Sequence, residues 1–182
     1  CINNGRNSLK NTLNKNLKKS TKKNVFFFQG LKIVQLDIDY SNYMGLFKRS
    51  IVFLKFAFIS TFYSLFNKFD VVFATSTPLT VAIPGIFSKI LLRRKFVFEV
   101  RDSWPELPYQ MGLLPNKFVY YSLLILEKLA YVSSDFCIGL APGICEIIES
   151  KGINKSKIIN IPNSCDIDIF QPLEQEKIKN PQ

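Results

Sequence analysis

The 182-residue chain contains no histidine, and this absence removes several classes of enzyme. Without an imidazole there is no Ser-His-Asp or Cys-His machinery, so acid–base chemistry has to come from Asp, Glu, Lys or Tyr. The four cysteines, Cys1, Cys137, Cys145 and Cys165, form no C-x-x-C pair, and the usual zinc ligand sets are therefore missing too. The composition predicts a reduced, cytosolic protein without a structural metal.

A secretory signal pattern is also lacking, and the chain opens with Cys1 rather than Met. We therefore expect a piece of a longer reading frame, or a processed product. Hydrophobic residues make up 47% of the chain, which is enough for one sizeable core. The length favours one domain with ragged ends.

Acidic residues are absent from the first 36 residues, which hold eight Lys or Arg in a chain of net charge +10. Such a segment favours an anionic partner, nucleic acid or an anionic membrane surface, unless it is a solvated tail with no partner. No nucleic acid is expected, because residues 1–24 contain no aromatic side chain to stack on bases. Leu9, Leu13 and Leu17 permit an amphipathic helix in this basic N-terminal segment, whose composition equally suits a mobile one.

The run Leu46–Phe66 is strongly apolar and contains seven aromatic residues. Lys48, Arg49 and Lys55 interrupt it, so its uninterrupted apolar part is shorter than the ~20 residues that span a bilayer. We expect a helix, with three alternatives for its surroundings: a protein core, the surface of a membrane, or a transmembrane span.

Upstream of this helix, the apolar runs 25–28 and 31–38 flank Gln29 and Gly30, which predicts a hairpin or two short strands. Downstream, strands and helices alternate. The predicted strands are 71–74, 96–100, 136–140 and 157–161, and the predicted helices are 79–92, 117–132 and 143–150. Each helix is long enough to cross back over the sheet, so the prediction is an α/β fold with a doubly wound, Rossmann-like parallel sheet and helices on both faces.

Ligands of such sheets gather where the strands end, so the loops after the strands are the candidate sites. The first loop holds hydroxyl side chains, including Ser76 and Thr77, followed by Pro78. This pattern is typical of a helix cap, and its free N–H groups also suit an anionic or hydroxyl-rich ligand. The later turn at Pro142 and Gly143 also has two interpretations: a proline in the first turn of a helix, or a secondary ligand site.

The loop 98–106 concentrates three carboxylates, a guanidinium and an indole within nine residues. Strand alternation aims Glu99 and Arg101 to one side, with Asp102 at the rim. A carboxylate there suits hydrogen bonding to a sugar hydroxyl, and Trp104 suits stacking on a pyranose. The alternative is an internal Arg–carboxylate pair that holds the loop, with Trp104 as a packing anchor.

Three segments carry a resemblance: VFATSTPLTVAIPGIFSKILLRRKFVFEVRDSWPELPYQMGLL, EKLAYVSSDFCIGLAPGICEII and KIINIPNSCDIDIF. Over residues 69–170 the chain resembles the N-terminal domain of bacterial family 4 glycosyltransferases. It is similar in particular to the subgroup that builds O-antigen, capsule or colanic-acid type polysaccharides. That subgroup has a Ser-Pro-Pro-like loop, a Glu-Val-Arg-Asp-x-Trp-Pro-Glu loop and an Ile-Pro-Asn-Gly-x-Asp segment.

The resemblance implies one half of a GT-B fold and a retaining glycosyltransferase that needs neither metal nor cofactor. Its substrates would be a nucleotide-sugar and a lipid-linked saccharide acceptor, met at the inner face of the cytoplasmic membrane by a peripheral protein. Asp102 is the catalytic candidate, because many relatives have at that position a His that contacts the transferred sugar. The substrate-binding candidates are Glu99, Arg101, Ser103, Trp104, Glu106, Ser76, Thr77, Pro142 and Gly143.

The chain departs from the family pattern in three places. No C-terminal domain with the family's paired glutamates follows Phe170, and no glycine-rich loop opens the chain. Ser164 and Cys165 stand where the family has Gly and a small apolar residue. We therefore expect an acceptor-side domain at 25–170 and a linker or tail at 171–182, inactive without a C-terminal GT-B domain. The alternatives are a truncated remnant or an acceptor-binding subunit that needs a separate donor-binding partner.

Overall fold

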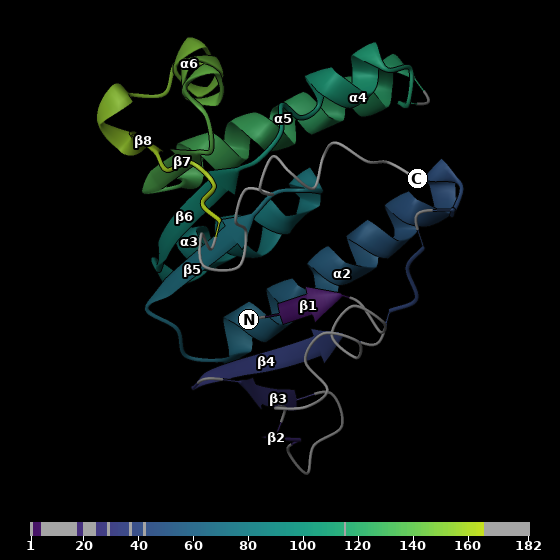
Figure 1. The fold of residues 1–182 in the computed structure, drawn as a ribbon, viewed down its shortest axis with the longest axis vertical. Coiled ribbons are helices and arrows are strands. Elements are labelled where there is room, and N and C mark those ends of the chain that lie inside the picture. Colours follow the sequence, from purple (N-terminus) through teal and green to yellow (C-terminus); the bar gives the residue numbers. More distant parts are fainter. Residues whose placement is uncertain are drawn as a thin grey trace, which may run out of the picture.

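A four-stranded parallel sheet forms the centre of the fold (Figure 1). Its strands are adjacent in chain order: β5 (Val71–Thr75), β6 (Lys95–Val100), β7 (Phe136–Gly139) and β8 (Ile158–Asn160). The computed structural model describes residues 2–4, 18–19, 25–28, 30–36, 38–41, 43–114 and 116–165. The prediction of an α/β fold with parallel strands is confirmed.

Helices connect the strands as the alternation predicts. The first connection is a 3-10 turn η1 (Leu79–Val81) and helix α3 (Ala82–Leu92), the second is α4 (Glu106–Gln110) and α5 (Lys117–Ser133), and the third is α6 (Pro142–Ser150) and a second 3-10 turn η2 (Lys155–Lys157). The short helix α4 was not predicted. It begins where the acidic-aromatic loop ends, and its length of five residues is too short for a periodic pattern.

The connecting helices lie on one face of the sheet, which corrects the prediction of helices on both faces for the described part of the chain. Gly85 of α3 faces the ring of Phe96, Tyr131 of α5 packs on Phe98, and Gly139 of β7 faces Cys145 of α6. The three strand residues of these contacts, Phe96, Phe98 and Gly139, face the same side of the sheet. The reason is topological: right-handed crossovers that always step to the next strand in the same direction put every helix on the same face.

The core lies between the sheet and these helices. Phe96, Phe98 and Tyr131 are among its largest buried side chains, and neighbouring rings lie with their centroids 6.1 Å apart. Gly85 permits this packing, because a Cβ there would lie 2.0 Å from the Phe96 ring. The opposite face of the sheet is open, and Phe73 and Phe136 on it are 54% and 44% exposed.

Asp135 ties α3 to the sheet just before β7. Its carboxylate accepts hydrogen bonds from Lys89 Nζ at 2.7 and 2.8 Å and from the Phe96 backbone N–H at 2.9 Å. Burial by itself raises the pKa of Asp135, but these hydrogen bonds and the charges of Lys89 and Lys95 outweigh it and lower the pKa below its usual value.

The Asp135→Asn variant is therefore expected to lose about 1–2 kcal/mol of unfolding free energy at neutral pH. A carboxyl group whose pKa is lowered by folding stabilises the fold above its unfolded pKa of about 3.9, and this contribution is lost as the pH falls through the lower folded pKa. Urea unfolding of both proteins at about pH 7 and about pH 3 checks this. The difference should shrink at the acid pH, and a difference that is independent of pH would contradict the assignment.

A second, smaller sheet holds the described N-terminal residues in the order β1-β4-β3-β2. Its strands are β1 (Ile2–Asn4), β2 (Lys18–Lys19), β3 (Val25–Phe28) and β4 (Leu31–Leu36). The predicted hairpin is confirmed, because β3 and β4 pair antiparallel around Gly30, which has φ +81°. The predictions for Leu9, Leu13 and Leu17 and for the tail 171–182 lie outside the described residues.

Helix α2 (Leu46–Phe66) precedes β5 and packs against α3 and η1. Its buried residues are Ala57, Ser60, Thr61 and Ser64. By length and composition it is also a helix that could cross a membrane. Only 22% of its most apolar stretch is buried inside the molecule. One side of α2 is therefore part of the protein interior, and the rest of the helix is exposed or half-buried.

Candidate functional site

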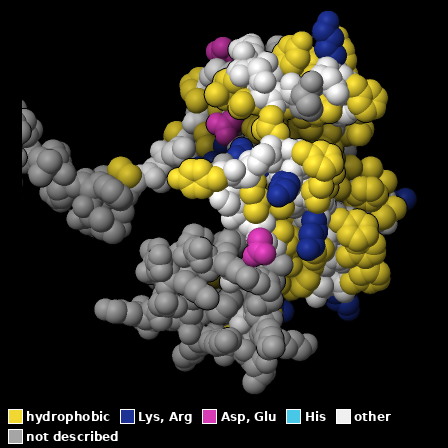
Figure 2. Space-filling model, turned by 90° about the vertical axis from the view of Figure 1, so that its right-hand side faces the viewer, with side chains coloured by type: hydrophobic (Ala, Val, Ile, Leu, Met, Phe, Trp, Pro, Cys, Tyr) yellow, Lys and Arg dark blue, Asp and Glu magenta, His cyan; other side chains and the backbone are white. Residues whose placement is uncertain are grey.

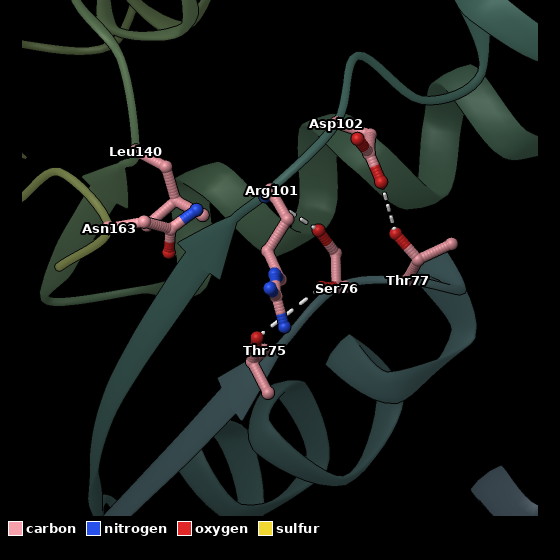
Figure 3. A pocket seen from close by; sticks show the side chains of 7 residues that line it. All are labelled: Thr75, Ser76, Thr77, Arg101, Asp102, Leu140 and Asn163. Carbon is pink, nitrogen blue, oxygen red and sulfur yellow. Dashed lines mark hydrogen bonds between the residues drawn. The ribbon is translucent and has the colours of Figure 1, made fainter. Parts of the chain in front are cut away.

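A polar pocket of about 400 Å³ opens at the C-terminal edge of the parallel sheet. All four strands contribute the residues that follow their ends (Figure 3). The lining residues are Thr75, Ser76, Thr77, Arg101, Asp102, Leu140 and Asn163. This is the edge where the rule for parallel sheets places ligands, and the volume falls in the range of small-molecule sites.

Three successive hydroxyl residues, the last residue of β5 and the two that follow it, connect this loop to the end of β6. Thr75 Oγ1 donates to Glu99 Oε1 at 2.6 Å, and Thr77 Oγ1 donates to Asp102 Oδ2 at 2.6 Å. Between them, the Ser76 N–H donates to the Glu99 carbonyl at 2.9 Å. The two loops are thus held in a fixed register, and Glu99 and Asp102 are both oriented by hydroxyl donors.

Ser76 is a structural link within the pocket wall. Its side chain is buried, and its Oγ accepts the Arg101 backbone N–H at 3.0 Å. The predicted binding residue Ser76 therefore lines the pocket, but its side chain is already used in holding the Arg101 backbone. Thr77, the second predicted residue of this loop, is exposed at the rim.

The Ser76→Ala variant is expected to lower the free energy of unfolding by about 1 kcal/mol, because the Arg101 N–H loses its acceptor at a partly buried position. Chemical denaturation measures the change. The matched control is Ser122→Ala, which removes an exposed hydroxyl that bonds only within its own helix, and it should change stability by less than about 0.5 kcal/mol. Equal losses in the two variants would contradict the role given to Ser76.

The side chain of Arg101 lines the pocket and points toward Thr75 (Figure 3). It forms no ion pair with any residue of the described ranges. The Arg–carboxylate pair that was the alternative explanation of this loop is therefore not seen there. The guanidinium keeps its donors for a ligand.

Asp102 lies at the other end of the pocket, where it and Thr77 point toward each other (Figure 3). One carboxylate oxygen accepts the Thr77 hydroxyl, and the side chain is exposed. A carboxylate held in this way can accept a hydrogen bond from a ligand hydroxyl through its other oxygen. The structure thus places Asp102 where the sequence predicted it, at the rim after β6.

Ser103 and Trp104 do not line the pocket. Both are half-buried, and Trp104 packs against the core cluster under the sheet. The Ser103 carbonyl accepts the Leu107 N–H at 2.9 Å and so holds the first turn of α4. Of the two roles considered for Trp104, packing anchor and sugar platform, the contacts agree with the anchor.

Glu106 also lies away from the pocket, in an ion-pair network with Lys151 and Glu127. Lys151 Nζ contacts Glu106 Oε1 and lies 2.7 Å from Glu127 Oε2. Glu127 is 1% exposed, and its second oxygen accepts the Tyr131 hydroxyl at 2.9 Å. This network connects α4, which follows the motif loop, to α5 and to the end of α6.

The environment of this network shifts its pKa values. Burial is the main reason that the pKa of Glu127 is raised, and the nearby Glu106 charge adds to it, against the hydrogen bonds from Lys151 and Tyr131. Burial alone would lower the pKa of Lys151, but its hydrogen bonds and charge interactions with Glu106 and Glu127 raise it. Lys151 is therefore held as a cation between two carboxyl groups.

Pro142 and Gly143 are exposed at the first turn of α6, outside the pocket lining. The neighbouring Leu140 forms the pocket wall on that side. Three lining residues were missed by the sequence interpretation: Thr75, Leu140 and Asn163. Ligands of parallel sheets bind near the ends of the strands, and this rule points to all three positions. Thr75 ends β5, Leu140 directly follows β7, and Asn163 lies in the segment after β8.

The chemistry of the pocket suits a polar, hydroxyl-rich ligand. Its side chains offer hydroxyls, an amide, a guanidinium and a carboxylate. Within the ranges that the structure describes, no group of three or more Cys, Asp or Glu side chains is arranged to hold a metal ion. No protein-family description and no curated protein matches the chain.

Proposed function

We propose that this chain is the acceptor-side domain of a GT-B glycosyltransferase and that the pocket at the sheet edge receives a saccharide. The observation that carries the proposal is the set of side chains at that edge, Thr77, Arg101, Asp102 and Asn163, which come from three different strand ends and face one cavity. Hydrogen-bond donors and acceptors in alternation are what sugar hydroxyls require.

The acidic-aromatic loop supports the assignment to this family of enzymes. Asp102, the residue that the resemblance aligns with a sugar-contacting His, lines the pocket, whereas Trp104 and Glu106 pack behind it. We assign Asp102 to the contact with the transferred sugar and Arg101 to a polar or anionic part of the bound substrates. Trp104 and Glu106 are assigned to holding the loop in place.

The proposed reaction transfers a sugar from a nucleotide-sugar to a lipid-linked saccharide in the assembly of a cell-surface polysaccharide, with retention and without metal or cofactor. The pocket is partly open at the surface, and every lining residue belongs to this sheet edge. A donor-binding GT-B domain is proposed to close this opening. The site of action is the inner face of the cytoplasmic membrane, where such an acceptor is anchored.

A non-catalytic acceptor-binding subunit, working with a separately encoded donor-binding protein, is the second candidate. The pocket favours this candidate too, because all of its lining residues belong to this chain and could bind an acceptor without a second domain. A truncated remnant would also carry the pocket, but without a donor-binding partner it would transfer nothing.

The proposal is tested by incubating the chain, linked to or mixed with its donor-binding domain, with labelled nucleotide-sugars and membrane lipid extract. Transfer of label into the lipid fraction is the expected result. Transfer that needs a separately added donor-binding protein supports the subunit form. Lack of both transfer and donor binding across a full panel of nucleotide-sugars would end the proposal.

A further inference from the structure

Helix α2 turns its large apolar side chains outward. Residues spaced by three or four positions lie on one face of a helix, and on α2 the exposed face is built from Phe47, Ile51, Leu54, Phe58 and Phe62. Phe47 is 80% exposed and Phe58 is 65% exposed. In a helix of a water-soluble protein this stripe would face the core.

The buried side of α2 is made of small residues instead. Ser60, Thr61 and Ser64 are buried, and each hydroxyl donates to a carbonyl of its own helix at 2.6–2.8 Å. Ser88 of α3 donates to Ser64 Oγ at 3.0 Å across the contact. Helices whose outer surface contacts lipid have this pattern: small and hydroxyl residues face the neighbouring helix, and large apolar residues face outward.

The neighbouring helices continue this surface. Helices α2, α3 and α5 lie side by side, with α3 in the middle (Figure 1). On α3 the outward side chains include Phe87, Ile90 and Leu91, and Ile83 joins Ile51, Leu54 and Phe58 in an apolar groove between α3 and α2. On α5 the outward side chains are Phe118, Tyr121, Ile125, Leu129 and Val132. We call this combined surface the helix-layer face.

The charges of the helix-layer face have one sign. Of the basic residues in the three helices, Lys48, Lys55, Lys117 and Lys128 are exposed, whereas the ammonium group of Lys89 is paired with Asp135. The one acid of these helices, Glu127, is buried. Figure 2 shows a side of the molecule on which hydrophobic side chains gather with Lys and Arg among them and few acidic ones. Apolar side chains bordered by cations complement an anionic lipid surface.

The geometry favours a helix that lies along a membrane over one that crosses it. Helix α2 packs against α3, which is fixed to the sheet through the buried Gly85–Phe96 contact. The chain returns from Phe66 to β5 of the same sheet within five residues. If α2 crossed the bilayer, the sheet to which it is attached would have to enter the bilayer as well. A helix lying in the interface needs to bury only its outward apolar side chains.

We propose that the helix-layer face is a docking surface for an anionic bilayer, with α2 lying in the plane of the interface. This deepens the proposed function, since it specifies how the domain meets a membrane that holds the acceptor. The bound lipid contacts the outer side chains of α2, α3 and α5, and the flanking lysines lie among the anionic headgroups. The open face of the sheet, with Phe73 and Phe136, takes no part.

The test measures binding of the 182-residue chain to vesicles of phosphatidylcholine with about 30% phosphatidylglycerol by co-sedimentation. The double variant Phe58→Ser, Phe87→Ser is expected to bind at least about tenfold more weakly. The matched control is Phe73→Ser, Phe136→Ser, whose phenylalanines are similarly exposed on the open sheet face, and it should bind like the unchanged chain. Thermal unfolding of each variant shows that it is folded.

Several outcomes would overturn the docking surface. The first is an equal loss of binding in both double variants. The second is equal binding of the unchanged chain to vesicles without phosphatidylglycerol. The third is a dimer of the unchanged chain that the Phe58→Ser, Phe87→Ser substitutions dissociate, because the face would then bind a second copy of the chain. No sugar donor is present in this assay. A lack of vesicle binding therefore does not contradict the proposed saccharide pocket. A lack of sugar transfer together with normal vesicle binding contradicts only the proposed function.

Discussion

Replacement of Asp102 by Asn is expected to lower the turnover of sugar transfer roughly 100-fold or more, while the free energy of unfolding changes by less than about 0.5 kcal/mol. The asparagine keeps an oxygen that can accept the Thr77 hydroxyl, so the loop geometry is preserved. What is lost is the negative charge at the pocket rim. Because Asp102 is exposed, this loss has little effect on folding.

Steady-state transfer rates, measured with this domain joined to its donor-binding domain, test the prediction alongside urea unfolding of the isolated chain. The control is Asp70→Asn, which removes an exposed carboxylate immediately before β5, at the opposite end of the sheet. The control should retain full turnover. If Asp102→Asn loses activity and stability in proportion, Asp102 has a structural role and the assignment is wrong.

The Lys151→Met variant is expected to lose about 3 kcal/mol or more of unfolding free energy at neutral pH. It leaves the buried Glu127 carboxylate without its cation and frees Glu106 from α6. Since the folded-state pKa of Glu127 is already raised, removal of Lys151 raises it further. The destabilisation should therefore grow as the pH rises through that pKa and become smaller in acid, where Glu127 takes up a proton.

Denaturant unfolding across this pH range measures the effect, and two variants control it. Lys155→Met removes an exposed lysine that follows α6 and should cost less than about 0.5 kcal/mol. Glu127→Gln added to Lys151→Met should recover part of the loss, because it removes the uncompensated buried charge. An unchanged stability of Lys151→Met would show that the network does not hold α4 and the motif loop.

The sequence predicted the α/β alternation because each element carries a local signal. Short runs such as 96–100 have the β-branched and aromatic residues that strands favour, and the helix starting after Asn116 has its cap in the sequence. The face that each helix covers has no local signal. It depends on the order of strands β5, β6, β7 and β8, and consecutive order puts the helices on one side.

The candidate site was predicted in part for the same reason. The loops after strands were identified, and Thr77, Arg101 and Asp102 line the pocket that forms there. The partner of Glu106 could not be found from sequence, because Lys151 lies 45 positions away, directly after another helix. Composition alone also gave no way to separate a sugar platform from a packing anchor at Trp104, since an indole suits both and only its contacts with the core distinguish them.

The central claim, that the edge of the parallel sheet binds a saccharide, is tested most directly by amide NMR of the chain during titration with the soluble saccharide headgroups released from membrane lipids. We expect saturable shifts at Thr75, Thr77, Asp102 and Asn163, which Asp102→Asn weakens without changing the rest of the spectrum. No shift at these amides with any headgroup, or saturable shifts confined to the open face around Phe73, would contradict the account.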